Sequence, residues 1–278
     1  GLNRATVSRP DPASQGRSLS TLVLLPHNDD EFFVSATIAQ AAAAGEDVLV
    51  AYTTYGSNYG TAAATRMDES TRVLGQLGVP ADRITSIGQE LDVFDGAAFG
   101  RLEAITTACL ERYGDASVGR IVTTAWEGGH TDHDGTHLVA VALARAWTLN
   151  DGLWEFPIYT AAGAPRPFFR TARFFDDRDR SGCAMGWRER VRLVALARHY
   201  RSQWRSFVGL LPEACLRYMA LGRQPIRRVV REPDAYLQPP HRGELFYERR
   251  FEVPHADFLT TTRPFIESRI MDPERSAS

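Results

Sequence analysis

Short apolar runs alternate with longer periodic segments along the first 160 residues of the chain. The runs at residues 21–26, 47–53, 83–87, 120–125 and 153–159 have the length and composition of buried strands. Between them, residues 31–44, 65–77, 97–113 and 134–147 have helical periodicity or Ala-rich composition. This alternation predicts an α/β fold with a Rossmann-like, mostly parallel sheet flanked by helices.

The pattern weakens after residue 160. Residues 186–207 keep helical periodicity, but residues 208–250 contain five prolines and only short apolar stretches. We therefore expect a flexible N-terminal tail over residues 1–18 and an α/β domain that carries the site over residues 19–207. Residues 208–278 are expected to form an irregular, Arg-rich C-terminal cap that packs on the same domain.

Polar side chains gather directly after the first predicted strand. Ligands of parallel sheets bind beyond the carboxyl ends of the strands, so the loops after residues 26 and 125 should line one crevice. The first loop contains an imidazole, an amide and three carboxylates in succession: His27, Asn28, Asp29, Asp30 and Glu31. Imidazole with carboxylate suits zinc, whereas acidic residues alone would also suit the start of a helix.

The loop after the predicted strand at residues 120–125 carries a second polar cluster. Two glycines precede His130, Thr131, Asp132 and His133, and they leave the backbone free to turn its histidines inward. Two such loops at one edge of a sheet predict a three-ligand zinc site with an open position. A competing interpretation pairs His133 with His137, four residues apart as in the helical His-Glu-x-x-His zinc motif. Gly135 between them disfavours it, which leaves His137 as a helix-face residue or a partner of a ligand.

Composition restricts the chemistry further. The chain has no lysine, so all 32 of its basic residues are arginine. Schiff-base, pyridoxal-phosphate and phosphate-loop lysine chemistry are therefore excluded, and a catalytic base must be a carboxylate or one of the seven histidines. A GC-rich genome is the simplest explanation for the missing lysines.

The net charge of −2 conceals an uneven distribution. Residues 1–160 contain 10 arginines and 20 acidic residues, whereas residues 161–250 contain 19 arginines and 9 acidic residues. The two parts either pair across their common surface or present arginines to an anionic part of a substrate. The second hypothesis singles out a group of arginines late in the chain: Arg223, Arg227, Arg228 and Arg231.

The two clusters resemble the paired motifs of one enzyme family. Residues 27–31 are similar to the His-Pro-Asp-Asp-Glu signature of the LmbE-like/PIG-L zinc-dependent N-deacetylases, and residues 129–133 to that family's Gly-His-Pro-Asp-His. Supporting segments lie at residues 66–69, 77–79 and 199–203. Asn28 and Thr131 replace the two family prolines, which changes local rigidity and hydrogen bonding.

The resemblance implies roles for individual residues. His27, Asp30 and His133 would hold one Zn²⁺ per chain, or another divalent metal such as Fe²⁺. Asp29 would be the general base and His130 the acid or oxyanion partner, with Asp132 orienting His130. Substrate contacts are expected from residues around the predicted crevice: Asn28, Tyr55, Arg66 and Trp126. The aromatic residues near the strand ends, which also include Phe32, Phe33 and Tyr59, either stack on a sugar ring or belong to the core.

The expected activity is hydrolysis of an N-acetyl or short N-acyl group on an amino sugar or glycosylated metabolite. The alternatives are an amidase for a larger acyl or thiol conjugate and a non-catalytic metal-, sugar- or nucleotide-binding module. We expect a small-molecule partner, with no nucleic acid and no integral membrane segment. Three widely spaced cysteines and an N-terminus without an apolar signal core favour a cytoplasmic location.

Overall fold

A computed structural model describes residues 19–56, 62–114, 116–176 and 182–272 of the protein. Its centre is a six-stranded sheet in the order β10-β5-β4-β1-β2-β3. Five neighbouring strands are parallel, and only the edge strand β10 runs antiparallel, against β5. The strands are β1 (Ser20–Leu25), β2 (Val48–Tyr52), β3 (Ile84–Ser86), β4 (Val118–Thr124), β5 (Leu153–Phe156) and β10 (Arg227–Arg228). The predicted α/β fold with a mostly parallel sheet is confirmed.

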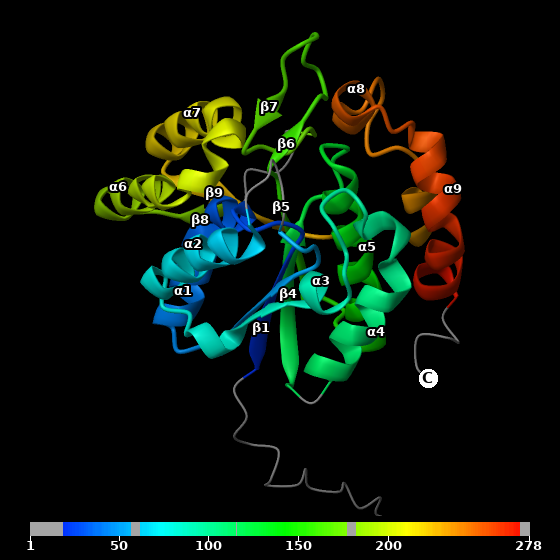
Figure 1. Ribbon diagram of the computed structural model, residues 1–278, viewed down its shortest axis with the longest axis horizontal. Coiled ribbons are helices and arrows are strands. Elements are labelled where there is room, and N and C mark those ends of the chain that lie inside the picture. The colour runs from blue at the N-terminus through cyan, green and yellow to red at the C-terminus, as the bar shows by residue number, and fades with distance from the viewer. Residues whose placement is uncertain (1–18, 57–61, 115, 177–181, 273–278) are drawn as a thin grey trace, which may run out of the picture.

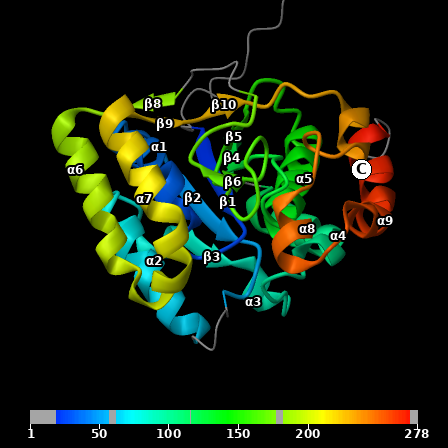
Figure 2. The same cartoon turned by 90° about the horizontal axis from the view of Figure 1, so that it is seen from above.

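Helices cover both faces of the sheet (Figures 1 and 2). One side carries α1 (Ser35–Ala43), α2 (Ala63–Gln76), α6 (Trp187–Leu196) and α7 (Trp204–Leu221). The other side carries α4 (Leu102–Tyr113), α5 (Thr131–Ala146) and α9 (His255–Phe265). Because side chains alternate along a strand, Val23 and Leu25 of β1 enter the first core, and Leu22 and Leu24 enter the second.

Shorter elements connect these layers. Short helices are α3 (Ile87–Glu90) and α8 (Phe246–Phe251), and a π-helical turn (Ile266–Met271) extends α9. Two small antiparallel pairs join β6 (Tyr159–Thr160) to β7 (Arg170–Thr171) and β8 (Gly182–Ala184) to β9 (Arg223–Pro225). Single 3₁₀ turns lie at Asp30–Val34, Ala81–Arg83, Ala98–Gly100, Ala197–His199, Arg201–Gln203 and Pro233–Leu237.

Two helix starts next to the polar clusters differ from the sequence prediction. The segment expected to be one helix from residue 31 begins as a 3₁₀ turn, Asp30–Val34, before α1. Helix α5 starts at Thr131, three residues earlier than expected. The side chain of His130 accepts a hydrogen bond from the backbone N–H of Asp132 (3.0 Å), so a histidine acts as the N-cap.

The segment expected to be irregular over residues 208–250 is partly regular. Helix α7 continues to Leu221 and contains Pro212, whose ring lies on the solvent side, where water can satisfy the carbonyl that loses its helical partner. After α7, Gln224 bonds to the backbone of Phe32 (2.9 Å) and Ala36 (2.7 Å), and β10 extends the main sheet. The prolines therefore mark turns between ordered elements, and the boundary predicted at residue 207 falls inside α7.

Among the helices of the described residues, none combines the length and the apolar composition needed to cross a bilayer. All three cysteines are free thiols; Cys109 is buried, while Cys183 and Cys215 are partly exposed.

Candidate metal centre

The two polar clusters meet at the carboxyl edge of the sheet. His27 follows β1, and the loop after β4 leads to His130 at the start of α5. Strands β1 and β4 are direct neighbours, with Leu24 opposite Thr123. The sheet topology therefore brings residues about 100 positions apart into one site, as the sequence predicts.

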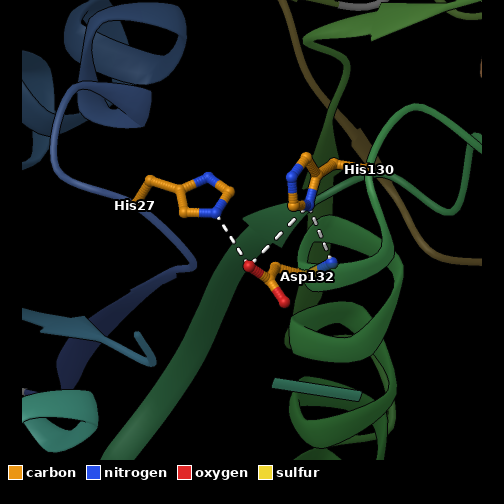
Figure 3. Close-up of side chains that lie close together, drawn as sticks. All are labelled: His27, His130 and Asp132. Carbon is orange, nitrogen blue, oxygen red and sulfur yellow. Dashed lines mark hydrogen bonds and ion pairs between the residues drawn. The ribbon is translucent and has the colours of Figure 1, made fainter. Parts of the chain in front are cut away.

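The site is built around two carboxylates and three imidazoles. The Nε2–H of His27 donates to Asp132 Oδ2 (3.0 Å), and His27 Nδ1 lies 3.4 Å from Asp30 Oδ2. His133 Nε2 lies 3.6 Å from the same Asp30 oxygen. The ring centre of His27 is 4.8 Å from that of His130 and 5.3 Å from that of His133. Figure 3 shows His27 and His130 on either side of Asp132.

Two overlapping triads of these residues could hold a metal ion. One is His27, Asp30 and His133, the ligand set that the family resemblance implies; the other is His27, His130 and Asp132. Within each triad, one ligand atom per residue lies within 4.8 Å of the others. Two imidazoles and one carboxylate form a donor set that suits Zn²⁺ or Fe²⁺, so the residues fit the expected metal.

The hydrogen bonds of Asp132 distinguish the two triads. Its Oδ1 accepts the backbone N–H of Ala98 (2.9 Å), and its Oδ2 accepts the backbone N–H of Gly96 (2.5 Å) as well as His27. Both oxygens of Asp132 are thus already bound to protein groups. In the described part of the chain, Asp30 Oδ2 accepts one backbone N–H, that of His27 (3.0 Å), and the same oxygen faces the imidazoles of His27 and His133.

The same contacts define the orientation of His130. Its Nδ1 accepts the N–H of Asp132 and lies 3.7 Å from the Asp132 carboxylate. A neutral imidazole whose Nδ1 accepts a hydrogen bond carries its proton on Nε2. His130 can therefore donate a hydrogen bond from Nε2. The closest polar contact of its ring is with the backbone N–H of Asp132.

Asp29 adopts an unusual backbone conformation, with φ at 113°. Positive φ is uncommon for a non-glycine residue and costs about 1–3 kcal/mol unless its surroundings enforce it. Here the N–H of Asp29 donates to Glu31 Oε2 (2.9 Å), and buried Glu31 also accepts the hydroxyls of Tyr52 (3.0 Å) and Tyr200 (2.9 Å). Glu31 therefore anchors the strained loop that presents Asp29 to the site.

Arg66 is buried beside the first cluster. Its guanidinium donates to Asp95 Oδ2 (2.7 Å) and to the backbone carbonyl of Asn28 (2.9 Å), and it lies 3.8 Å from Asp29 Oδ1. Asp95 also accepts the N–H of Gly56 (3.0 Å). Arg66 and Asn28 are each only 2% exposed, so both support the loop of Asp29 from the interior of the protein.

Burial and hydrogen bonding separate the pKa values of the site residues. Burial lowers the pKa of His130 to about 4 and that of His133 to about 3. Burial alone would also lower the pKa of His27, but the hydrogen bonds that its imidazole donates to Asp132 and Asp30 raise it well above its ordinary value. The pKa of Asp132 falls to about 2 against the effect of burial, chiefly because it accepts the bond from His27. Burial raises the pKa of Asp29, and the charge of Arg66 only partly opposes this.

The two glycines of the second cluster are required by packing. Gly128 has φ of +69°, and a Cβ at Gly129 would lie 2.2 Å from the carbonyl oxygen of Tyr159. Buried Glu127 fixes the same loop, because its Oε1 accepts the N–H groups of Ile158 (2.7 Å) and Tyr159 (3.0 Å). Asp134 accepts the N–H of Glu127 (3.1 Å) from the other side. The loop that carries His130 is thus held by hydrogen bonds between buried carboxylates and backbone N–H groups.

His137 does not belong to the metal site, although α5 runs through both His133 and His137. His137 Nδ1–H donates to the carbonyl of Thr124 (2.8 Å), and Nε2 lies 3.1 Å from the hydroxyl of Tyr236. Both nitrogens are engaged elsewhere, so the helical zinc motif is rejected.

The substrate contact expected from Trp126 is wrong. Trp126 is 1% exposed and packs in the second core, with its ring centre 5.4 Å from that of Tyr236. Phe32 and Phe33 are also core residues. A residue next to a strand end can point into the core as easily as into the crevice, and the pattern of the sequence does not separate the two. Tyr59 lies outside the described residues.

Tyr55 is partly exposed after β2, and its ring stacks on that of Phe94, with ring centres 5.4 Å apart. Phe94 is 56% exposed and immediately precedes Asp95, the partner of Arg66. Tyr55 is therefore accessible to solvent near the residues that support the site. Its expected contact with a substrate stays a prediction.

Sequence reasoning missed two aromatic side chains that contact the histidines of the site. The ring of Tyr159 lies 5.2 Å from that of His133, and the ring of Phe251, at the end of α8, lies 4.6 Å from that of His130. Phe246, at the start of α8, donates its N–H to the carbonyl of Gly128 (2.8 Å). No motif indicates these contacts, since α8 follows the second cluster by more than 100 residues.

Two of the four arginines singled out as anion ligands pair with acidic residues of the chain. Arg227 donates to Glu155 (2.8 Å) and Asp176 (2.6 Å), and Arg228 pairs with Asp151 (2.5 Å). Arg231 lies over the ring of Tyr236, 5.7 Å from its centre. Arg223 belongs to β9, paired with β8. For Arg227 and Arg228, pairing between the two halves of the chain replaces the expected substrate contact.

Comparison with known proteins agrees with the motifs. Residues 22–144 match the model of the family described as PIG-L, GlcNAc-PI de-N-acetylase, which confirms the family resemblance. No curated protein matches the sequence significantly.

Several solved structures share the fold at low sequence identity. A deacetylase of the teicoplanin biosynthesis pathway is 18% identical, with a TM-score of 0.55 over 76% of this chain and 98% of its own. The A40926 pseudoaglycone deacetylase is 19% identical, with a TM-score of 0.56 over 78% of this chain and 100% of its own. A zinc-inhibited form of teicoplanin deacetylase is 16% identical, with a TM-score of 0.55 and coverage of 76% and 98%.

Proposed function

Because residues 22–144 match the PIG-L family model, we propose that the chain is a metal-dependent N-deacetylase. The observation that carries this proposal is the convergence of the two His/Asp clusters at one edge of the sheet. A metal-binding triad lies there beside an uncoordinated carboxylate, Asp29, and a further imidazole, His130. Amide hydrolysis needs these components: a Lewis acid, a base and a donor to the oxyanion.

We assign the metal to His27, Asp30 and His133. Both oxygens of Asp132 are already engaged with backbone N–H groups, whereas Asp30 Oδ2 faces the other two ligands. Asp132 would then hold the second nitrogen of His27, an arrangement in which a carboxylate orients a ligating imidazole and raises its basicity. In this assignment Asp132 acts mainly on His27, and its backbone N–H orients His130.

The remaining residues supply the proton transfers. A divalent ion at this triad would polarise the amide carbonyl and favour deprotonation of water. Asp29 would accept the proton of the attacking water; Glu31 and Arg66 hold its loop, which lies between the proposed ligands His27 and Asp30 in the sequence. Nε2–H of His130 is the donor for the developing oxyanion, and a proton returned from Asp29 or His130 allows the amine to leave. Water adds to the acyl carbon as the C–N bond breaks, which gives a free amine and acetate.

The proposed substrate is an N-acetylated amino sugar or glycosylated metabolite. The family description names a sugar de-N-acetylase, and the partly exposed Tyr55 offers an aromatic surface at the carboxyl edge of the sheet. Asn28 and Arg66 are proposed to act by supporting the loop of Asp29, since both are buried. A cytoplasmic location remains part of the proposal and rests on the three unpaired cysteines.

Acetate release tests the proposal directly. The full chain, stripped of metal and reloaded with one equivalent of Zn²⁺ or Fe²⁺, is expected to release acetate from N-acetylglucosamine derivatives. Both metals are tested, and excess Zn²⁺ is avoided, because a relative with this fold has a zinc-inhibited form. A chelator should abolish the activity, and stoichiometric metal should restore it. A metal-loaded protein that releases larger acyl groups and no acetate would support the amidase alternative, and no release from any amide would reject hydrolysis.

A further inference from the structure

Helix α7 presents an apolar row to solvent. Its inner side buries Phe207, Ala214 and Tyr218. Its outer side carries residues spaced by four, so that they share one face: Trp204, Val208, Pro212, Leu216 and Ala220. Trp204 is 60% exposed, Val208 67% and Leu216 71%. We call this row the α7 face.

An exposed helix normally turns polar side chains outward, so the α7 face needs an explanation. The neighbouring helix α6 adds two exposed apolar residues one turn apart, Trp187 (64%) and Val191 (47%). Figures 1 and 2 both show α6 and α7 side by side on the outside of the molecule. The apolar area thus extends over a pair of helices.

This helix pair is strongly basic. Residues 187–221 contain seven arginines and two glutamates. Five of these arginines are exposed: Arg188, Arg192, Arg198, Arg201 and Arg205. Within the described parts of the chain, none of the five forms an ion pair with a carboxylate.

The positive charge is concentrated where α7 begins. Arg198 and Arg201 lie six and three residues before Trp204 in the sequence. The guanidinium of Arg205 lies 5.6 Å from the centre of the Trp204 ring. Partial burial lowers the pKa of His199, and the charges of Arg198, Arg72 and Arg201 lower it further, so these groups lie close together. An apolar row therefore starts at a cluster of cations.

We propose that the α7 face docks on an anionic lipid bilayer. Trp204, Val208 and Leu216 would enter the boundary between head groups and acyl chains, while the flanking arginines would bind lipid phosphates. Tryptophan and arginine beside a helical apolar stripe are the residue types that favour this interface. The helix would lie in the plane of the membrane.

Charge and shape favour a bilayer over a second copy of the chain. Two basic helix pairs facing each other would repel, whereas an anionic surface attracts them. Recognition of a helical peptide needs a groove between elements, whereas the longest exposed apolar row follows the outer side of α7, with only two exposed apolar residues of α6 beside it. Docking on a bilayer is independent of the deacetylase activity proposed above.

Vesicle flotation with the full chain tests the inference. The protein is expected to float with vesicles of phosphatidylcholine and phosphatidylglycerol at low salt, and to stay unbound with phosphatidylcholine alone. Trp204→Ser should weaken binding about tenfold or more, and Val208→Ser and Arg201→Gln about fivefold each. Matched controls are Val230→Ser, which removes a 90% exposed valine, and Arg263→Gln, which removes an exposed arginine of α9. Both should bind like the unchanged protein.

Three results would overturn the inference. One is the absence of flotation with phosphatidylglycerol, and another is an equal loss of binding in the controls. The third is a dimer in sedimentation velocity that Trp204→Ser dissociates, because a second copy would then cover the face. Thermal unfolding of each variant establishes that lost binding does not reflect a lost fold.

Discussion

Replacing Asp132 by asparagine separates the two possible ligand sets of the metal centre. Asp132 accepts hydrogen bonds from His27 (3.0 Å), Gly96 (2.5 Å) and Ala98 (2.9 Å), and an amide keeps only one accepting oxygen. At least one of these donors then faces an NH₂ group. A hydrogen bond to a charged group contributes about 1.5–3 kcal/mol, and loss of a carboxylate that orients a ligating histidine weakens metal binding about 10–100-fold.

The assay is a competition titration with a coloured chelator. If Asp132 only orients His27, Asp132→Asn should still bind one equivalent of Zn²⁺, about 10–100-fold more weakly. Asp30→Asn removes a proposed ligand and should abolish stoichiometric binding. Asp95→Asn is the matched control, since Asp95 also accepts a backbone N–H but lies outside both triads. Its metal affinity should change by less than about threefold, a difference too small for the loss of a ligand.

One pattern of results would refute this reasoning. If Asp132→Asn abolishes metal binding while Asp30→Asn only weakens it, the ligands are His27, His130 and Asp132, and the assignment above is wrong. Thermal unfolding of the metal-free variants checks that each one folds before its affinity is compared.

The remaining predictions concern the proposed base Asp29, the buried histidine His137 and the ion pairs of Arg227. Asp29→Asn should keep the metal but lower kcat by about 10²–10⁴-fold, as steady-state kinetics of the metal-loaded protein can measure; an unchanged kcat would exclude Asp29 as the base. Burial lowers the pKa of His137 to about 4, below the 6.5 of the unfolded chain, so unfolding takes up a proton as the pH falls. The metal-free protein should therefore lose about 3 kcal/mol of stability between pH 6.5 and 4 through this group, and urea unfolding of His137→Gln should lack that part of the slope. Arg227→Met leaves Glu155 and Asp176 without their partner and should cost about 3 kcal/mol of stability in urea unfolding. Its KM for anionic and neutral substrates should stay the same, whereas a raised KM for anionic substrates alone would restore the substrate-contact hypothesis.

The parts of the fold that the sequence predicted depend on local patterns. Apolar runs become β1, β2, β4 and β5 because most of their side chains are buried by helices on the two faces of the sheet. The charged exceptions, Arg120 of β4 and Glu155 of β5, form ion pairs with Glu46 and Arg227. The position of the site also followed from local information, since carboxyl ends of parallel strands must share one edge. His27, Asp30, His130 and His133 are brought together as predicted.

Local patterns were wrong or left two outcomes open where a neighbour remote in sequence decides. Trp126 enters the core because Tyr236 and Phe258 pack against it, and Arg227 is unavailable to an anion because Glu155 and Asp176 bind it. Prolines after residue 208 suggested irregular structure, yet Pro212 lies on the solvent side of α7. In each case the local pattern fits both outcomes, and only packing selects one.

The sequence by itself determined the α/β class, the chemistry of the site and the absence of lysine chemistry, because these depend on residue type and on short-range periodicity. The tertiary structure decided which atoms of the site are free and which are engaged. Asp132 and Asp30 are both carboxylates in His/Asp motifs, but backbone N–H groups of Gly96 and Ala98 occupy the first and leave the second facing the imidazoles. Hydrogen-bond partners come from the spatial path of the whole chain, and for that reason no motif contains them.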